Sequence, residues 1–216
     1  MSQPPQPSRR TNVYIDSRNL YYGCLKNTPY RWLDVAEMAQ RSLPAHYVIG
    51  RIHFFTAKVS ARPGGDPQQP QRQEAFFRAL ETLPNLTMHY GTFLTTDVMM
   101  PLVTPLLDGT RFARVIKTEE KGSDVNIVAT LISEGYKGDY GAAAVVSDDS
   151  DLAEALRIVR YDLRLHVRVL SPRGRAHELR QAANRFHKID PAVLKASQFP
   201  PTLQDAHGTF HKPANW

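Results

Sequence analysis

A short acidic segment, "SDDSD" over residues 147–151, directly follows a run of small and β-branched apolar residues. Three carboxylates this close repel one another unless a helix N-terminus, hydrogen bonds or a cation relieve the repulsion. Two more acids occupy comparable places: Asp16 ends the apolar run "NVYID", and Asp124 follows the turn at Lys121 and Gly122. Clusters of carboxylate oxygens suit Mg²⁺ or Mn²⁺, which can activate water for attack on a phosphodiester.

Helix capping is the competing explanation for these acids, because carboxylates are favoured at helix N-termini. Capping alone would account for Asp124 or for Asp149. It would account for Asp16 only if the chain turned helical directly after that residue.

The elements that must position these acids alternate along the chain. Apolar runs predict strands over 12–16, 46–59, 86–94, 142–147 and 163–171, and helical spacing predicts helices over 32–43, 74–83, 123–136, 150–162 and 177–186. This order predicts an α/β fold with a mainly parallel central sheet and helices on both faces. Ligands of such sheets bind beyond the carboxyl ends of the strands, so the acids are expected to converge at one edge.

The remaining segments set the domain limits. Residues 1–11 are rich in Pro and Gln and are predicted to be a disordered leader. Residues 12–190 are predicted to form one domain, and 191–216, which show little periodicity, a C-terminal extension. Residues 97–116 contain two prolines and are predicted to be irregular, as a hairpin excursion from the domain would be.

Composition limits the function classes. The 216 residues carry a net charge of +6, which favours a polyanionic partner, although a generic basic surface would look the same. Cys24 is the only cysteine, so an intrachain disulfide is excluded and a reducing, cytoplasmic location is expected. The N-terminus has no secretory signal pattern, and no apolar run is long enough to span a membrane.

Several common catalytic motifs are absent from the sequence. No glycine-rich turn follows the first predicted strand, and no GxxxxGK[ST] phosphate loop occurs. The sequence also lacks an HExxH pair, a second cysteine for a zinc site and a GxSxG nucleophile elbow.

Three segments together, "VYIDSRNLYYG", "EKGSDVNIVATLI" and "VVSDDSDLAEALRIV", resemble the NYN family, a branch of the PIN-like nuclease superfamily. The resemblance runs from about residue 11 to 190, and "HELRQAANRFHKI" resembles the final helix and strand of that family. It implies a three-layer Rossmann-like (PIN-like) fold, metal-dependent endoribonuclease activity and single-stranded or structured RNA as the partner. It also allows a homo-oligomer.

The resemblance assigns roles to individual residues. Metal ligation falls to the acids of the three segments: Asp16, Asp124, Asp149 and Asp151. Asn19 would orient a carboxylate or a water beside them. Contact with nucleic acid falls to Lys121 of the KGxD turn and to Ser147 and Ser150, which flank the last acids.

A basic stretch over 157–185 holds eight arginines and only two acids. Arg173 and Arg175 lie in the Pro/Gly loop beyond the strand predicted over 163–171, near the expected acidic edge. They are therefore predicted to bind RNA phosphates. A charged edge strand that deters sheet-to-sheet pairing is the alternative explanation for this stretch.

Two positions depart from the family pattern. Thr130 stands where members often carry another acid, and Asp148 stands where a glycine is common. The Thr130 departure supports a rival hypothesis, a catalytically weak RNA-binding or regulatory module on the same fold. A phosphatase for small phosphate esters is a third, but the basic surface is wider than such a substrate needs.

Overall fold

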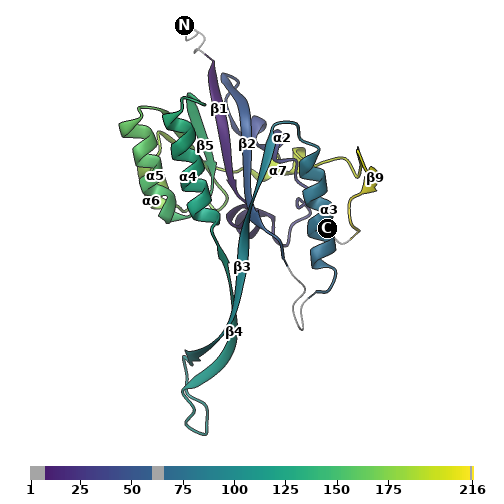
Figure 1. Ribbon diagram of the computed structural model, residues 1–216, viewed down its shortest axis with the longest axis vertical. Coiled ribbons are helices and arrows are strands. Elements are labelled where there is room, and N and C mark those ends of the chain that lie inside the picture. Colours follow the sequence, from purple (N-terminus) through teal and green to yellow (C-terminus); the bar gives the residue numbers. More distant parts are fainter. Residues whose placement is uncertain (1–7, 60–65, 215) are drawn as a thin grey trace.

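The computed structural model describes residues 8–59, 66–214 and 216. Its central sheet has the strand order β4-β3-β2-β1-β5-β6-β7 (Figure 1). All neighbouring strands are parallel except β3 and β4, which confirms the mainly parallel α/β sheet predicted from the sequence. The strands are β1 (Arg9–Asp16), β2 (Tyr47–Ala57), β3 (Leu86–Pro101), β4 (Phe112–Lys121), β5 (Ala142–Val146), β6 (His166–Ser171) and β7 (Arg185–Lys188).

Helices cover both faces of this sheet. Helices α4, α5 and α6 lie on one face, and α2, α3 and α7 lie on the other (Figure 1). The helical segments are α1 (Ser17–Leu20), η1 (Tyr21–Leu25), α2 (Val35–Ser42), α3 (Gln69–Glu81), α4 (Ser123–Tyr136), η2 (Ser150–Leu152), α5 (Ala153–Arg157), η3 (Ile158–Asp162), α6 (His177–Ala182) and α7 (Pro191–Ala196).

The central strands are apolar throughout because both of their faces are buried. Side chains of successive strand residues point to opposite faces. Val13 and Ile15 of β1 therefore pack in the core under α2 and α3, while Tyr14 packs in the core under α4 and α5. The sheet is thus the middle layer of three, as the family resemblance implies.

Strands β3 and β4 form a long antiparallel arm. Ten residue pairs, from Thr92–Lys121 to Pro101–Phe112, hold the two strands together. The arm extends well beyond the helical layers, past the edge where β1 ends (Figure 1). The prediction of an irregular 97–116 segment is wrong for 97–101 and 112–116, which belong to β3 and β4, while 102–111 form the irregular connection of a hairpin excursion.

The C-terminal segment packs on the face that carries α2 and α3. A small hairpin, β8 (Thr202–Asp205) and β9 (Gly208–His211), follows α7. Arg78 of α3 forms an ion pair with Asp205 at 2.5 Å. The Trp216 ring lies 5.4 Å from Phe76 and 6.4 Å from Trp32, measured between centroids.

Element boundaries differ from the prediction in several places. Strand β1 begins at Arg9 rather than residue 12, and α3 begins at Gln69 rather than residue 74. The helix predicted over 177–186 ends at Ala182, after which β7 pairs with β6. Residues 1–7 of the predicted leader lie outside the described residues. Across the described ranges, no helix is both long and apolar enough to cross a membrane.

Candidate metal centre at the carboxyl edge of the sheet

Asp16 is the last residue of β1 and also the N-cap of α1, since the chain turns helical at Ser17. The residue is 4% exposed. One carboxylate oxygen accepts the backbone N–H of Asn19 at 3.0 Å, and the other accepts the Asn19 side-chain amide at 2.6 Å. Capping therefore fixes the orientation of Asp16, and Asn19 has the orienting position that the family resemblance implies.

Ser147 links Asp16 to the acidic segment after β5. Its hydroxyl donates to the second carboxylate oxygen of Asp16 at 2.9 Å and accepts the N–H of Asp149 at 3.0 Å. The side chain is fully buried. The strand order places β1 beside β5, so one hydroxyl can join the ends of both strands.

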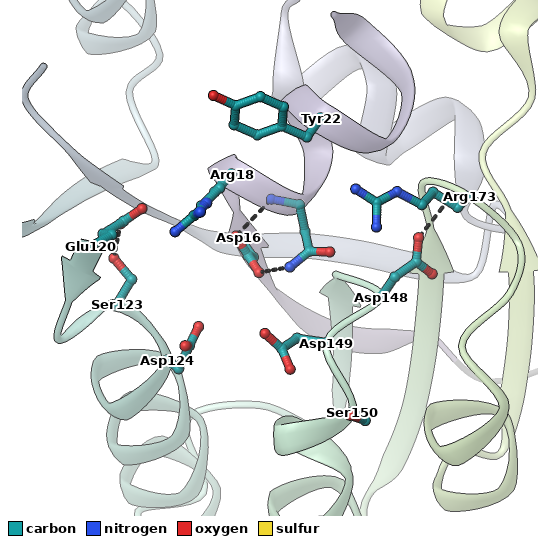
Figure 2. Close-up of a pocket in the computed structure, with 11 residues that line it drawn as sticks. Asp16, Arg18, Tyr22, Glu120, Ser123, Asp124, Asp148, Asp149, Ser150 and Arg173 are labelled. Atoms are coloured by element: carbon teal, nitrogen blue, oxygen red, sulfur yellow. Dashed lines mark hydrogen bonds between the residues drawn. The ribbon is translucent and has the colours of Figure 1, made fainter. Parts of the chain in front are cut away.

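Asp16, Asp124 and Asp149 come together at this edge. Each offers a carboxylate oxygen, and these three oxygens all lie within 4.8 Å of one another. Asp124 lies in the first turn of α4, two residues after Gly122, whose φ of 95° allows the sharp turn from β4. Figure 2 shows the Asp124 and Asp149 side chains turned toward Asp16 from their separate elements.

The carboxylates perturb one another. Burial raises the pKa of Asp124 to about 6, helped by the nearby charges of Asp16, Asp149 and Glu120. Burial also raises the pKa of Asp16, and the hydrogen bonds from Asn19 and Ser147 offset part of that rise. Crowded carboxylates hold their protons more tightly than usual. A hard divalent cation would displace these protons and bind the oxygens. The donor set therefore fits Mg²⁺ or Mn²⁺.

An open cavity of about 500 Å³ lies over these acids. Arg18, Tyr22, Glu120 and Ser123 also line it, and Glu120 accepts a hydrogen bond from the Ser123 hydroxyl. Sequence reasoning did not assign Arg18 or Glu120 a role. Their positions in the sequence could have identified them, because Arg18 lies between Asp16 and Asn19 and Glu120 directly precedes Lys121 of the turn.

Four residues expected at the site have other surroundings. Asp151 is exposed and does not line the cavity, although its charge contributes to the raised pKa of Asp124. Lys121 pairs with Glu119 at 3.0 Å. Ser147 is buried beneath the acids, and Arg175 lines a neighbouring cavity. Ser150 and Arg173 do line the acidic cavity, as Figure 2 shows, and Thr130 does not.

Asp148 holds the loop that carries Arg173. Its carboxylate accepts the Ser171 hydroxyl with one oxygen and the Arg173 backbone N–H, at 2.6 Å, with the other. The acid that replaces the family's usual glycine is thus turned away from the other three carboxylates (Figure 2). Its role in the structure is to fix the loop after β6.

Asp148→Ala is expected to loosen this loop without removing a charge from the acidic cluster. We expect RNA to bind about threefold to tenfold more weakly, because the Arg173 backbone loses a charge-assisted hydrogen bond and its side chain is held less firmly in the cavity. Fluorescence anisotropy with a labelled oligonucleotide would measure this. Asp148→Asn, which retains an acceptor, should lose less, and equal losses in both variants would contradict the positioning role.

Comparison with known proteins identifies the family. The family model described as "NYN domain" matches residues 10–190. The chain belongs to the NYN domain family. This NYN chain is also 29% identical to "6-hydroxy-3-succinoylpyridine 3-monooxygenase HspA" of Pseudomonas putida, over 96% of this chain and 75% of that protein. The crystal structure of VPA0982, a protein of unknown function from Vibrio parahaemolyticus, has a similar fold, with a TM-score of 0.56 and 17% identity over 88% of this chain and 98% of that one.

Proposed function

We propose that this NYN-domain protein is an endoribonuclease that depends on Mg²⁺ or Mn²⁺. NYN domains are generally nucleases, and the observation that carries the proposal is the convergence of Asp16, Asp124 and Asp149 within 4.8 Å under an open cavity. A divalent cation in this cluster would neutralise phosphate charge and lower the pKa of a water molecule. Water then adds to phosphorus, the bond from phosphorus to one sugar oxygen breaks, and that oxygen takes a proton.

The residues of the chain divide this work. Asn19 and Ser147 hold the Asp16 carboxylate in one orientation, so it need not reorganise during the reaction. Asp124 and Asp149 complete the set of metal ligands, and Asp151 adds negative charge beside these three carboxylates. Arg18 and Arg173 extend into the cavity (Figure 2), where we place the non-bridging oxygens of the phosphodiester. Ser150 lines the same cavity, and Lys121, which pairs with Glu119, does not line it.

The shape and charge of this edge favour RNA over a small phosphate ester. The cavity is open, and Tyr22 at its border is 51% exposed, so its ring can stack on an unpaired base. The net charge of +6 supports phosphate binding along a strand. Single-stranded or looped RNA has the splayed bases that such a border can reach. With Cys24 as the only cysteine, we place the enzyme in the cytoplasm.

The direct test is to incubate the protein with labelled single-stranded, hairpin and duplex RNAs in Mn²⁺, Mg²⁺ or EDTA. The proposal predicts cutting of unpaired RNA that stops in EDTA and returns when Mn²⁺ is added. If the protein binds these RNAs but cuts none of them with either ion, the rival module that binds RNA without efficient catalysis is correct. Release of phosphate from small esters without RNA cutting would support the phosphatase instead.

The similarity to a named monooxygenase brings in a second enzymatic candidate, because it extends over 96% of the chain. A monooxygenase inserts one oxygen atom of O₂ into its substrate and reduces the other to water with two electrons from a reductant. We would therefore measure O₂ uptake with 6-hydroxy-3-succinoylpyridine and NADH. Uptake that requires both compounds, without RNA cutting, would replace the ribonuclease proposal.

Proton competition gives a pH-dependent prediction for the cluster. The folded pKa of Asp124, about 6, lies above its ordinary value of 3.8, so in the metal-free protein its contribution to stability is present below about pH 4 and is lost as pH rises through 6. A bound cation favours the ionised carboxylate instead, so at neutral pH it stabilises the folded protein. We expect Mn²⁺ at a hundred times its Kd to contribute ~2.7 kcal/mol at pH 7.5, and clearly less at the same concentration at pH 5.

Differential scanning fluorimetry with Asp124→Asn provides the control. This variant should melt at a higher temperature than the wild type in EDTA at pH 7.5, because a repelled carboxylate is gone. It should also lose most of the Mn²⁺-induced shift. An Mn²⁺ shift that is equal in both proteins, or equal at both pH values, would contradict the assignment of Asp124.

A further inference from the structure

A second cavity of about 370 Å³ adjoins the acidic one on the same edge of the sheet. Its lining combines apolar side chains with three cations. The apolar side chains are Pro172, Ile189, Pro191 and Leu194, and the cations are Arg173, Arg175 and Lys188. The cations come from the loop after β6 and from the end of β7. Arg173 lines both cavities, so the two adjoin at this residue.

The strand order explains this arrangement. β5, β6 and β7 are consecutive in the sheet, and neighbouring strands lie about 4.8 Å apart. The edge therefore carries acids beyond β1 and β5 and cations beyond β6 and β7. A chain of phosphates that crossed the acidic cluster and continued along the edge would meet the cations next.

The positive charge of this second cavity is not neutralised by neighbouring acids. None of the ion pairs formed within the described ranges involves Arg173, Arg175 or Lys188. Asp148, which lies beside the Arg173 backbone, is already bonded to the Ser171 hydroxyl and the Arg173 N–H. Three guanidinium and ammonium groups thus remain available to an anionic ligand.

Close packing shapes the wall between η1 and the loop after β6. A Cβ atom on Gly23 would lie 2.4 Å from the Pro172 Cβ, so only glycine permits this approach. Gly174 has a φ of 78° and packs against the Lys188 side chain. Tyr30, half-buried, forms part of the opposite wall. Close packing therefore builds this wall into the fold, and the cavity offers apolar side chains to a base and a cationic rim to its phosphate.

We propose that this cavity is a subsite for the nucleotide next to the one whose phosphodiester lies at the acidic cluster. Arg175 and Lys188 bind its phosphate, and the apolar wall and Tyr30 contact its base. The inference rests on the ribonuclease proposal and gives that site a substrate class: an RNA strand that extends past the scissile bond toward β7, rather than a mononucleotide.

The test is RNA binding by the double variant Arg175→Gln/Lys188→Gln, measured in EDTA so that cleavage is not needed. Fluorescently labelled oligonucleotides of two to eight nucleotides would be titrated at several salt concentrations. Removing two phosphate contacts should reduce the slope of log K against log salt by about 1.4. The double variant should also lose the gain in affinity that the wild type shows when the RNA is lengthened. Lys137→Gln/Arg164→Gln, two exposed cations at the opposite edge, is the control.

The outcomes separate this subsite from the ribonuclease proposal. If the wild type binds RNA without cutting it and the double variant shows the smaller salt slope, the subsite stands and the catalytic proposal fails. If the wild type cuts RNA but the double variant binds like the control, the subsite is wrong and the catalytic proposal stands. A wild type that does not bind RNA overturns both.

The β3–β4 arm, residues 92–121, supports a second and independent inference. Among the described residues, fourteen large apolar side chains are exposed, and eight of these lie on the arm: Leu94, Met99, Met100, Val103, Leu106, Leu107, Phe112 and Ile116. The strand register places Met100 on one face of the arm and Met99, Phe112 and Ile116 on the other. Apolar surface is therefore present on both faces and at the tip.

Charge distinguishes the arm from the rest of the chain. The arm contains four basic and four acidic residues, so it is neutral in a protein of net charge +6. Its charges pair internally: Arg114 with Asp97, and both Lys117 and Lys121 with Glu119. Such a surface attracts neither RNA nor a strongly charged protein. It suits an apolar partner surface with equally balanced charge, which the same arm of another copy provides.

We infer that two copies of this chain associate through their arms. Within the described ranges no strand pairs with the outer side of β4, and β4 contains no proline that would block pairing there. A two-stranded ribbon is marginally stable alone, and a second ribbon covers its apolar side chains. A two-fold dimer uses the same patch on both copies, and the thirty residues of the arm match the roughly 20–30 residues per side of a stable interface.

Sedimentation velocity of the full chain at 1–100 μM tests this inference. The wild type should sediment as a dimer, and Met99→Glu/Ile116→Lys as a monomer with an unchanged circular dichroism spectrum. Tyr136→Lys, which replaces an exposed aromatic residue on α4, should remain dimeric. A monomeric wild type, or a dimer that survives the double substitution, would overturn it.

Discussion

Asp149→Asn is expected to reduce metal-dependent RNA cleavage by about a hundredfold or more, because one fixed charge of a preorganised site disappears. The substitution preserves shape. The Asp149 side chain also accepts the N–H of Asp151 at 3.0 Å, and asparagine can keep that bond. The loss should therefore appear in kcat with little change in the melting temperature of the metal-free protein. Single-turnover cleavage of a labelled RNA in Mn²⁺ measures it.

Two other acids serve as matched controls for this experiment. Asp162→Asn removes an exposed carboxylate at the end of η3, far from the cavity lining, and should leave the rate unchanged. Asp151→Asn removes charge beside the cluster and should cost only a few-fold, because this side chain does not line the cavity. A loss in Asp151→Asn as large as that in Asp149→Asn would restore Asp151 as a direct ligand.

Glu134→Ala is expected to lower the free energy of unfolding by about 3–5 kcal/mol, the largest stability effect predicted for a single substitution. Glu134 lies on α4 and is 7% exposed. Its carboxylate accepts hydrogen bonds from the Tyr14 hydroxyl at 2.6 Å, the Asn12 amide at 2.8 Å and the Arg51 guanidinium at 2.8 Å. It also contacts the His53 ring at 3.1 Å. Removing it leaves buried donors on β1 and β2 without an acceptor.

The electrostatics of this network support the same expectation. Burial alone would raise the pKa of Glu134, but hydrogen bonds from Tyr14, Asn12 and Arg51 outweigh burial and lower it. The folded state therefore stabilises the charged form. Urea unfolding at pH 7.5 measures the loss. Glu154→Ala, on an exposed face of α5, should change stability by less than about 0.5 kcal/mol. A Glu134→Ala loss below about 1 kcal/mol would contradict this account of the network.

Much of the acidic site could be predicted because strand ends and chain order determine it. "NVYID" and "AAAVVS" are apolar throughout, which indicates strands buried on both faces, and the topology of parallel sheets brings their carboxyl ends to one edge. That argument correctly brought Asp16, Asp124 and Asp149 together. The helix predicted over 123–136 has the bounds observed for α4.

Side-chain direction within "SDDSD" could not be predicted from spacing. The segment forms a capping turn and a short η2, so its three acids point in different directions. Asp148 turns toward Ser171 and Asp149 toward Asp16, while Asp151 faces solvent. Contacts with the ends of β1 and β6 orient Asp149 and Asp148, and the spacing of the segment itself does not contain these contacts.

The regular strand pairing of the arm and the start of β7 at Arg185 could not be predicted, for different reasons. Pro101, Pro105 and the turn around Gly109 interrupt the strand pattern, yet the prolines lie at the last pair and in the connecting loop, where no ladder hydrogen bond is needed. Strand β7 has four residues, too few for a period of two to be distinguished from the end of a helix. Its pairing with β6 is a tertiary effect.

The most direct measurement is the position of Mn²⁺ in crystals of the protein, from anomalous scattering at the manganese edge, combined with RNA cleavage at the same Mn²⁺ concentration. We predict manganese between the carboxylates of Asp16, Asp124 and Asp149, and cleavage that rises as this position fills. Cleavage in Mn²⁺ while manganese is absent from these three carboxylates, or manganese bound there without any cleavage of unpaired RNA, would contradict the account.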